Sequence, residues 1–144
     1  MFAGIMALLL AVGAVTSVDY AFLEVGDSPD APRIAASIRE LADDDLATNN
    51  FAMIPQPNSE PVRYYLFREG SRDARVLSEQ FFPPELLRET LASGGRVFAF
   101  VDEGRTFDDL IALYGADDVS GVSLEFVEFV ALPTGRVGEV RLRN

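Results

Sequence analysis

The sequence predicts an α/β protein: an N-terminal transmembrane helix followed by a small three-layer domain, whose mostly parallel sheet closes with a C-terminal antiparallel hairpin. Three observations lead to this prediction. The run Phe2–Val18 carries no charge. Strand-like and helix-like segments then alternate as far as Tyr114, which favours a parallel sheet with helices on both faces. Finally, the turn residues Pro133–Gly135 separate two β-rich segments, which is typical of a hairpin.

The apolar N-terminal run is long enough to be a membrane anchor. A bilayer core needs about 20 apolar residues, and about 17 is the lower limit. Phe2–Val18 reaches that limit, and Tyr20 and Phe22 extend the run with aromatic rings that suit the membrane interface. The expected organisation is an anchor over 1–24, a linker over 25–32 and an extracytoplasmic α/β domain over 33–144.

Two other interpretations of this run remain open from the sequence alone. A cleaved signal peptide would have a shorter apolar core behind a positive segment, and no Lys or Arg precedes the run. The small residues Val12-Gly13-Ala14 form only a weak cleavage site. A helix buried in a soluble fold is the third reading, and a charge-free stretch at the extreme N-terminus argues against it.

Charge around the run gives its orientation. Lys and Arg near a span tend to stay in the cytoplasm. The downstream flank has four acids, Asp19, Glu24, Asp27 and Asp30, before its first basic residue, Arg33. We therefore expect a single-pass protein of the cell membrane whose soluble domain lies outside the cytoplasm.

The first half of the domain alternates between helix and strand. Apolar residues at helical spacing predict a helix that ends at about Leu41. The short apolar run Phe51–Ile54 predicts a buried strand. Ser59 as a cap and Gly70 as a stop favour a helix over Pro61–Arg68. The Val, Tyr and Phe residues of that segment would also suit a strand, so both readings remain.

The alternation continues in the second half. Arg75–Leu77 reads as a strand, Pro84–Ser93 as a helix and Arg96–Asp102 as the clearest buried strand. Thr106–Tyr114 is expected to be a helix, because Thr106 and Asp109 have the spacing of a capping box. The chain then ends in two β-rich segments, Val122–Leu132 and Arg136–Arg143, which form the predicted hairpin.

Composition excludes one class of partner. The chain has 23 acidic and 12 basic residues, for a net charge of -11, and all of its basic residues are Arg. Both GC-rich coding and adaptation to high salt would produce this pattern. In either case no basic patch is available to neutralise phosphates, so nucleic acid is not an expected partner.

The missing residue types limit the chemistry. The chain contains no Cys and no His, which removes thiolate nucleophiles, cysteine-held metals and the commonest general base. We therefore expect no cofactor, no metal and no catalytic residue. The run Asp43-Asp44-Asp45 consists of possible Ca²⁺ or Mg²⁺ ligands, but consecutive residues rarely converge on one ion, so a solvated helix end is favoured.

Four residues are candidates for ligand binding. Asp102 and Glu103 end the strongest predicted strand, and ligands of open α/β sheets bind beyond the carboxyl ends of strands. An acid at this place could hold a sugar hydroxyl; the alternative is a polar strand exit before a turn. Tyr64 and Tyr65 could stack on a sugar or a lipid headgroup, although adjacent aromatic residues more often fill a core.

The order of these segments resembles a known architecture. The apolar helix, the segments AASIREL, VRYYLFREG and RVFAFVDEG, and the final GRVGEVRLRN resemble the C-terminal extracytoplasmic domain of polytopic lipid-linked-sugar glycosyltransferases, the relatives of protein O-mannosyltransferases and aminoarabinose transferases. The resemblance implies a last transmembrane helix that leads into a small α/β domain. It covers nearly the whole chain.

The chain departs from this family in one large respect. The family's catalytic acid lies in an early extracytoplasmic loop among about ten transmembrane helices, and this chain has one apolar run and no such loop. The resemblance therefore implies an accessory or binding domain in surface glycan assembly, without transfer activity of its own. The expected partners are membrane lipid and either a polytopic membrane protein or a glycan. The alternative is a tethered or secreted envelope interaction protein without glycan chemistry.

Overall fold

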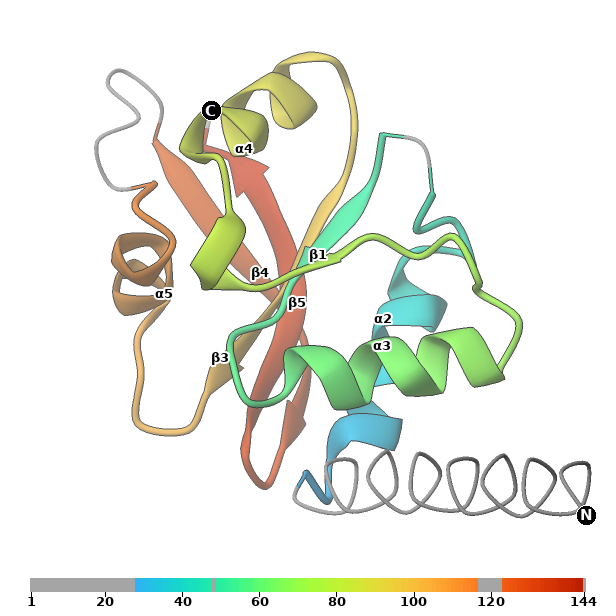
Figure 1. The fold of residues 1–144 in the computed structure, drawn as a ribbon. Helices are drawn as coiled ribbons and strands as arrows, with labels where there is room; N and C mark the ends of the chain where they lie inside the picture. Colours follow the sequence, from blue (N-terminus) through green and yellow to red (C-terminus); the bar gives the residue numbers. More distant parts are fainter. Residues whose placement is uncertain (1–27, 48, 117–122, 144) are drawn as a thin grey trace, which may run out of the picture.

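A computed structural model describes residues 28–47, 49–116 and 123–143 (Figure 1). The expected anchor over 1–24 lies outside these ranges. Among the helices within them, none has the length and apolar character needed to cross a bilayer.

The described chain forms an α/β domain. Its elements are α2 (Ala31–Leu41), β1 (Phe51–Met53), α3 (Ser59–Arg68), β2 (Val76–Leu77), the short 3-10 helix η1 (Glu79–Phe81), α4 (Pro84–Ala92), β3 (Val97–Asp102), α5 (Phe107–Leu113), β4 (Leu124–Leu132) and β5 (Gly135–Leu142).

The sheet is mixed rather than mostly parallel. Its strand order is β2-β1-β3-β5-β4. The pairs β1–β2 and β1–β3 are parallel, whereas β3–β5 and β4–β5 are antiparallel. The predicted hairpin is present, but it pairs with β3 and supplies two of the five strands. Parallel and antiparallel pairings are therefore equal in number, and the expectation of a mostly parallel sheet needs this correction.

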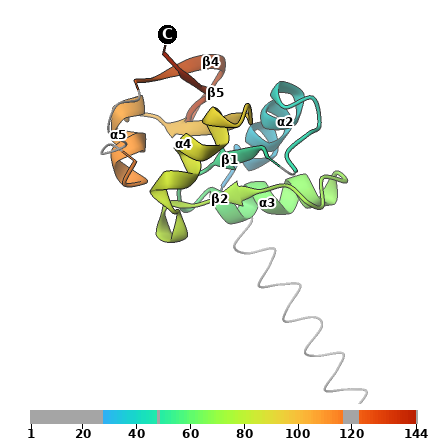
Figure 2. The same cartoon turned by 90° about the horizontal axis from the view of Figure 1, so that it is seen from above.

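Alternate residues of β3 build two cores on opposite faces of the sheet. Phe98 and Phe100 pack on one face with α2 and α3. Val97, Ala99 and Val101 pack on the other face with residues of α4 and α5. Figure 2 shows the strands between these two pairs of helices. Side chains of a strand alternate between the two faces of the sheet, and helices cover both faces here. A central strand such as β3 therefore needs apolar residues at every position.

The helix predictions are confirmed with small shifts in their ends. The segment that could also have been a strand is α3, so the helical reading is the right one. The predicted capping box of α5 is present: the Thr106 hydroxyl accepts from the Asp109 amide, and the Asp109 carboxylate accepts from the Thr106 amide at 2.7 Å. Helix α2 begins at Ala31, two residues before the expected start of the domain at residue 33.

A single irregularity lets β4 contribute to both cores. Leu124 and Phe126 pack on the α4–α5 side, whereas Val130 and Leu132 pack on the α2–α3 side. The register shifts between Glu128 and Val130. One extra residue in a strand reverses the facing of every residue that follows, because the side-chain period is two.

An ion cluster joins the parallel and antiparallel parts of the sheet. The Glu139 side chain in β5 is only 8% exposed and accepts hydrogen bonds from Arg96 Nε at 2.9 Å and Arg141 Nη2 at 2.6 Å. Arg96 also donates to the Leu41 carbonyl at 2.8 Å, and its guanidinium lies 5.0 Å from the Phe98 ring centroid. This cluster therefore ties the end of α2 to β3 and β5.

The surroundings of Glu139 keep its carboxylate ionised. Burial acts to raise its pKa, but the hydrogen bonds from Arg96 and Arg141 outweigh burial, and the pKa lies below its ordinary value of 4.5. A carboxyl group with a lowered pKa stabilises the fold above its unfolded-state value, and that contribution is lost as pH falls through the folded-state value.

Replacing this carboxylate tests the cluster. We expect Glu139→Gln to lower the free energy of unfolding at neutral pH by about 1–3 kcal/mol, because two guanidinium groups lose a buried, charged hydrogen-bond acceptor. Urea denaturation measures the difference. It should be complete above pH 4.5 and disappear as pH falls through the lowered pKa. As a control, Glu128→Gln alters an exposed carboxylate 3.8 Å from Arg136 and should change stability by less than about 0.5 kcal/mol. Equal effects of the two variants would contradict the structural role of the cluster.

Candidate functional site

Asp102 lies where sequence analysis placed it, at the carboxyl end of β3. Its side chain is about one quarter exposed, and its Oδ2 lies 3.8 Å from Arg105 Nη1. Asn58, which follows β1, donates to Asp102 Oδ1 over 3.4 Å. Because β1 and β3 are parallel, their carboxyl ends share one edge of the sheet, and this edge brings the two polar residues together.

The pKa of Asp102 is raised. Burial is the main cause, and it exceeds the opposing effect of Arg105; the negative charge of Glu79 adds to it. The same two acids, Glu79 and Asp102, also act on Tyr114. Burial and the nearby charges of Glu79 and Asp102 raise the pKa of Tyr114, whose hydroxyl donates to the Leu77 carbonyl at 2.7 Å. The folded state therefore disfavours the ionised form of Asp102, and carboxyl groups with raised pKa values are common at functional sites.

Glu103 differs from its neighbour. Its side chain is exposed, and its backbone amide donates to the Thr134 carbonyl at 2.8 Å. Both acids line a hollow of about 220 Å³ between the end of β3 and the β4–β5 turn. The other residues lining it are Gly104, Arg105, Ala131, Leu132, Pro133, Gly135 and Arg136.

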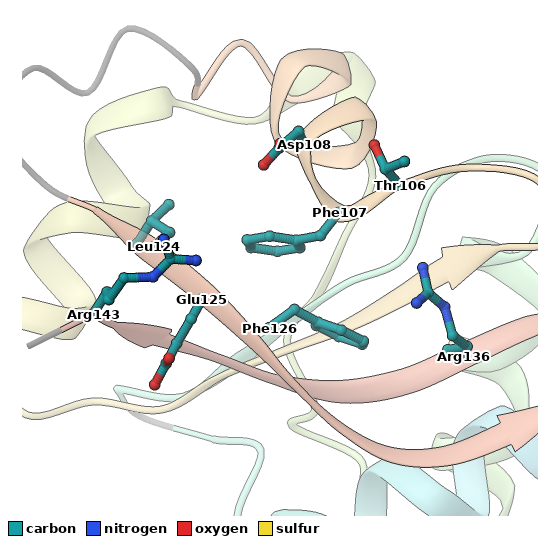
Figure 3. Close-up of a pocket in the computed structure, with 8 residues that line it drawn as sticks. All are labelled: Thr106, Phe107, Asp108, Leu124, Glu125, Phe126, Arg136 and Arg143. Atoms are coloured by element: carbon teal, nitrogen blue, oxygen red, sulfur yellow. The ribbon is translucent and has the colours of Figure 1, made fainter.

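A second hollow, of about 340 Å³, lies between α5 and the β4–β5 hairpin. Figure 3 shows its eight lining residues, with Phe107 and Phe126 in the centre, Arg143 on one side and Arg136 on the other. The two rings are stacked, with centroids 5.5 Å apart and planes at 21°. Asp108 contributes a carboxylate, and Thr106, Leu124 and Glu125 complete the lining; the Glu125 carboxylate points away from the two rings. We refer to this hollow as the aromatic groove.

A glycine fixes the floor of the aromatic groove. A Cβ atom on Gly138 would lie 2.6 Å from the ring of Phe126 and 2.3 Å from the Val127 carbonyl oxygen. The ring therefore lies directly on the backbone of β5, where only glycine leaves room. This contact holds Phe126 in place to stack against Phe107.

The two arginines of the groove are held differently. Arg136 donates to the Arg105 carbonyl at 3.2 Å, lies 3.8 Å from Glu128 and has its guanidinium 5.9 Å from the Phe126 ring centroid. It lines both hollows. Within the described part of the chain, no hydrogen bond or ion pair engages the guanidinium of Arg143. Arg143 is exposed.

The predicted tyrosines lie elsewhere. Tyr64 and Tyr65 are both in α3, with ring centroids 5.3 Å apart and planes at 80°. Tyr65 packs against the core on the α2–α3 face, and Tyr64 is 36% exposed. Neither lines the hollow that contains Asp102 and Glu103. The four candidate residues therefore do not form one site.

Sequence analysis did not single out the aromatic groove. Phe107 and Phe126 are 19 positions apart and both read as ordinary core residues. Arg136 lies in β5 and Arg143 directly follows it, where alternating Arg residues are expected on an exposed face. Only the hairpin's position beside α5 brings the four together.

The remaining acidic runs form no metal centre in the described residues, where no group of three or more potential His, Cys, Asp or Glu ligands converges. Asp43 and Asp44 adopt positive φ values at the end of α2, and each pairs with an arginine. Asp109 belongs to the capping box of α5.

Comparison of the chain with protein-family models, curated proteins and solved structures gives no match in any of the three.

Replacing Asp102 tests whether its negative charge lowers the free energy of unfolding. A carboxyl group with a raised pKa destabilises the fold at neutral pH, and this cost disappears as pH falls towards the ordinary value of 3.8. We expect Asp102→Asn to raise the free energy of unfolding by about 0.5 kcal/mol at pH 7, with a smaller difference near pH 4. Asp73→Asn, at an exposed turn, is the matched control and should have no effect. A clear loss of stability in Asp102→Asn would show that the charge is structural.

Proposed function

We propose that this chain is a membrane-anchored extracytoplasmic accessory domain that binds a saccharide during surface glycan assembly. In this proposal the domain binds and positions its ligand, and another polypeptide carries out any transfer reaction. The aromatic groove is the observation that carries the proposal. The segment order that resembles the tail of lipid-linked-sugar glycosyltransferases supports the glycan assignment.

The groove has the size and surface that a saccharide needs. Its volume of about 340 Å³ is at the lower end of the range for small-ligand sites. The stacked rings of Phe107 and Phe126 offer an apolar surface to the C–H face of a sugar ring. Aromatic side chains provide a large contact area of defined geometry, which suits a flat, rigid ligand.

Polar groups surround this apolar floor. The Arg143 guanidinium can donate to sugar hydroxyls, and the carboxylate of Asp108 can accept from them. Hydrogen bonds in which one partner is charged are about twice as strong as neutral ones. An apolar platform with a few charged groups at its margin therefore gives a saccharide both contact area and orientation.

Binding without catalysis is consistent with the residue inventory. The chain contains neither His nor Cys, so a reaction would depend on carboxylates, Tyr, Ser, Thr or Arg. Asp102 is the carboxylate with a raised pKa, and its contacts are Asn58 and Arg105. Glycoside chemistry commonly requires a pair of carboxyl groups on either side of the scissile bond. Of the acids near Asp102, Glu79 does not line the same hollow, and Glu103 is its neighbour in the chain.

A tryptophan reporter tests saccharide binding. The chain has no Trp, so Phe107→Trp introduces a single indole into the floor of the groove. We expect its emission to change saturably when monosaccharides and oligosaccharides are titrated. Adding Arg143→Gln should weaken binding about tenfold, because a charged hydrogen bond contributes about 1.4 kcal/mol. Arg68→Gln in α3, on the other face of the sheet, is the matched control and should leave affinity unchanged. Absence of saturable change with every saccharide would contradict the proposal.

One observation favours a second function, that of an envelope interaction protein without glycan chemistry. In the described chain β4 is an edge strand that pairs only with β5. Val127 and Phe129 on it are 37% and 45% exposed. An exposed edge can receive a strand from another protein. However, Glu125, Glu128 and the register shift at Glu128–Val130 are features that protect edges, so this function is the second choice.

Fractionation tests the proposed anchor and its orientation. We expect the full chain to remain with membranes after a carbonate wash and to need detergent for release, because residues 1–24 would span the bilayer. Protease added to the outer face of intact cells should digest the domain. A variant that begins at residue 25 is the control and should be released. Full-length protein in the cytosol, or a domain cut only after lysis, would contradict this assignment.

A further inference from the structure

We propose that the carboxyl-end edge of the parallel strands faces the membrane surface, held there by hydrogen bonds that bind the start of the domain to this edge. The proposal rests on the membrane anchor proposed above and adds which face of the domain meets the lipid headgroups. We call this edge the proximal edge. It consists of the segments 55–58, 103–105 and 133–134.

The first tie is made by Asp30, which directly precedes α2. Its Oδ2 accepts from the Thr134 hydroxyl at 2.7 Å and from the Thr134 amide at 3.2 Å. Thr134 lies in the β4–β5 turn, and its carbonyl accepts from the Glu103 amide. The Asp30 side chain is only 9% exposed. A carboxylate with two hydrogen bonds and little solvent access is a rigid connection, unlike an exposed ion pair.

The second tie is made by Ser28, the first described residue. Its hydroxyl donates to the Asn58 side-chain oxygen, and Asn58 in turn contacts Asp102. Ser28 is buried. The two ties engage the loop after β1, the loop after β3 and the hairpin turn. Ser28 and Asp30, at the start of the domain, are therefore both hydrogen-bonded to the proximal edge.

The arrangement of the domain follows from this entry point. Figure 1 shows the start of α2 beside the β4–β5 turn at one end of the molecule, and the C-terminus at the other end. β3 has six residues, so its two ends are about 17 Å apart along the strand. Only a few residues separate the proposed anchor from Ser28. Such a short connection holds the proximal edge close to the bilayer and leaves the opposite edge, where α4 ends, farther away.

Charge does not set this orientation. Arg33 and Arg105 near the proximal edge are exposed, and the neighbouring acids Asp102 and Glu103 balance them. The expected attraction to anionic lipid is therefore weak. The covalent connection and the two ties determine the orientation, so it should not depend on salt or on lipid charge.

Single cysteines measure the orientation without background, because the chain has no native Cys. The full chain is reconstituted in phosphatidylcholine vesicles that contain a lipid with a spin-labelled headgroup, which quenches nearby fluorophores. One fluorophore is attached at Glu103→Cys on the proximal edge and another at Ala92→Cys at the end of α4; both positions are exposed. We expect about twofold or greater quenching at residue 103 relative to residue 92, because of the separation of about 17 Å.

Loosening the ties tests their role. Ser28→Ala with Thr134→Val removes both hydroxyl donors and should reduce the difference in quenching between the two positions. Ser71→Ala, at a turn after α3, is the matched control and should preserve the difference. Thermal unfolding of each variant checks that the domain remains folded.

The outcomes separate the proposals. Membrane-bound protein with equal quenching at both positions, or stronger quenching at residue 92, would overturn the orientation and leave the anchor intact. Protein that does not bind vesicles would overturn the anchor and the orientation together. Stronger quenching at residue 103 that persists in the double variant would support the orientation but assign it to the covalent connection rather than to the ties.

Discussion

The carboxylate of Glu139 is the interaction on which the rest of this structure depends. It lies in β5, and the guanidinium groups of Arg96 and Arg141 surround it. Through Arg96, which also donates to the Leu41 carbonyl, it fixes the hairpin against β3 and the end of α2. The hairpin's position beside α5 in turn creates the aromatic groove. The cluster thus adds side-chain hydrogen bonds to the backbone pairing of β3 and β5, which joins the two halves of the sheet.

Most of the fold could be predicted from the sequence because its local signals agree with its tertiary structure. Thr106 and Asp109 have capping-box spacing and form that box, and the apolar run through Phe98 and Phe100 is the central strand. The arrangement of the hairpin could not be predicted, because the partner of β5 depends on contacts such as Arg96–Glu139 that lie 43 positions apart. No local pattern records such a contact.

The candidate site was predictable only in part, for a similar reason. The position of Asp102 follows from the rule that ligands meet the carboxyl ends of parallel strands, and the structure adds Asn58 and Arg105 to it. The aromatic groove gave no comparable signal. The role of Phe126 depends on Gly138, whose missing Cβ lets the ring lie on the backbone, and this pairing exists only in the folded sheet.

The two hollows and the proposed orientation connect through Arg136. This residue lines the hollow at the proximal edge and also the aromatic groove, whose other end is marked by Arg143. Arg143, which directly follows β5, is seven positions after Arg136, and this corresponds to about 23 Å of strand. With the proximal edge at the membrane, the groove would extend away from the bilayer from Arg136 towards Arg143. A saccharide carried on a lipid would then reach the stacked rings with its lipid still in the membrane. The orientation itself is set by the proposed anchor and the two ties, so it does not depend on which saccharide binds.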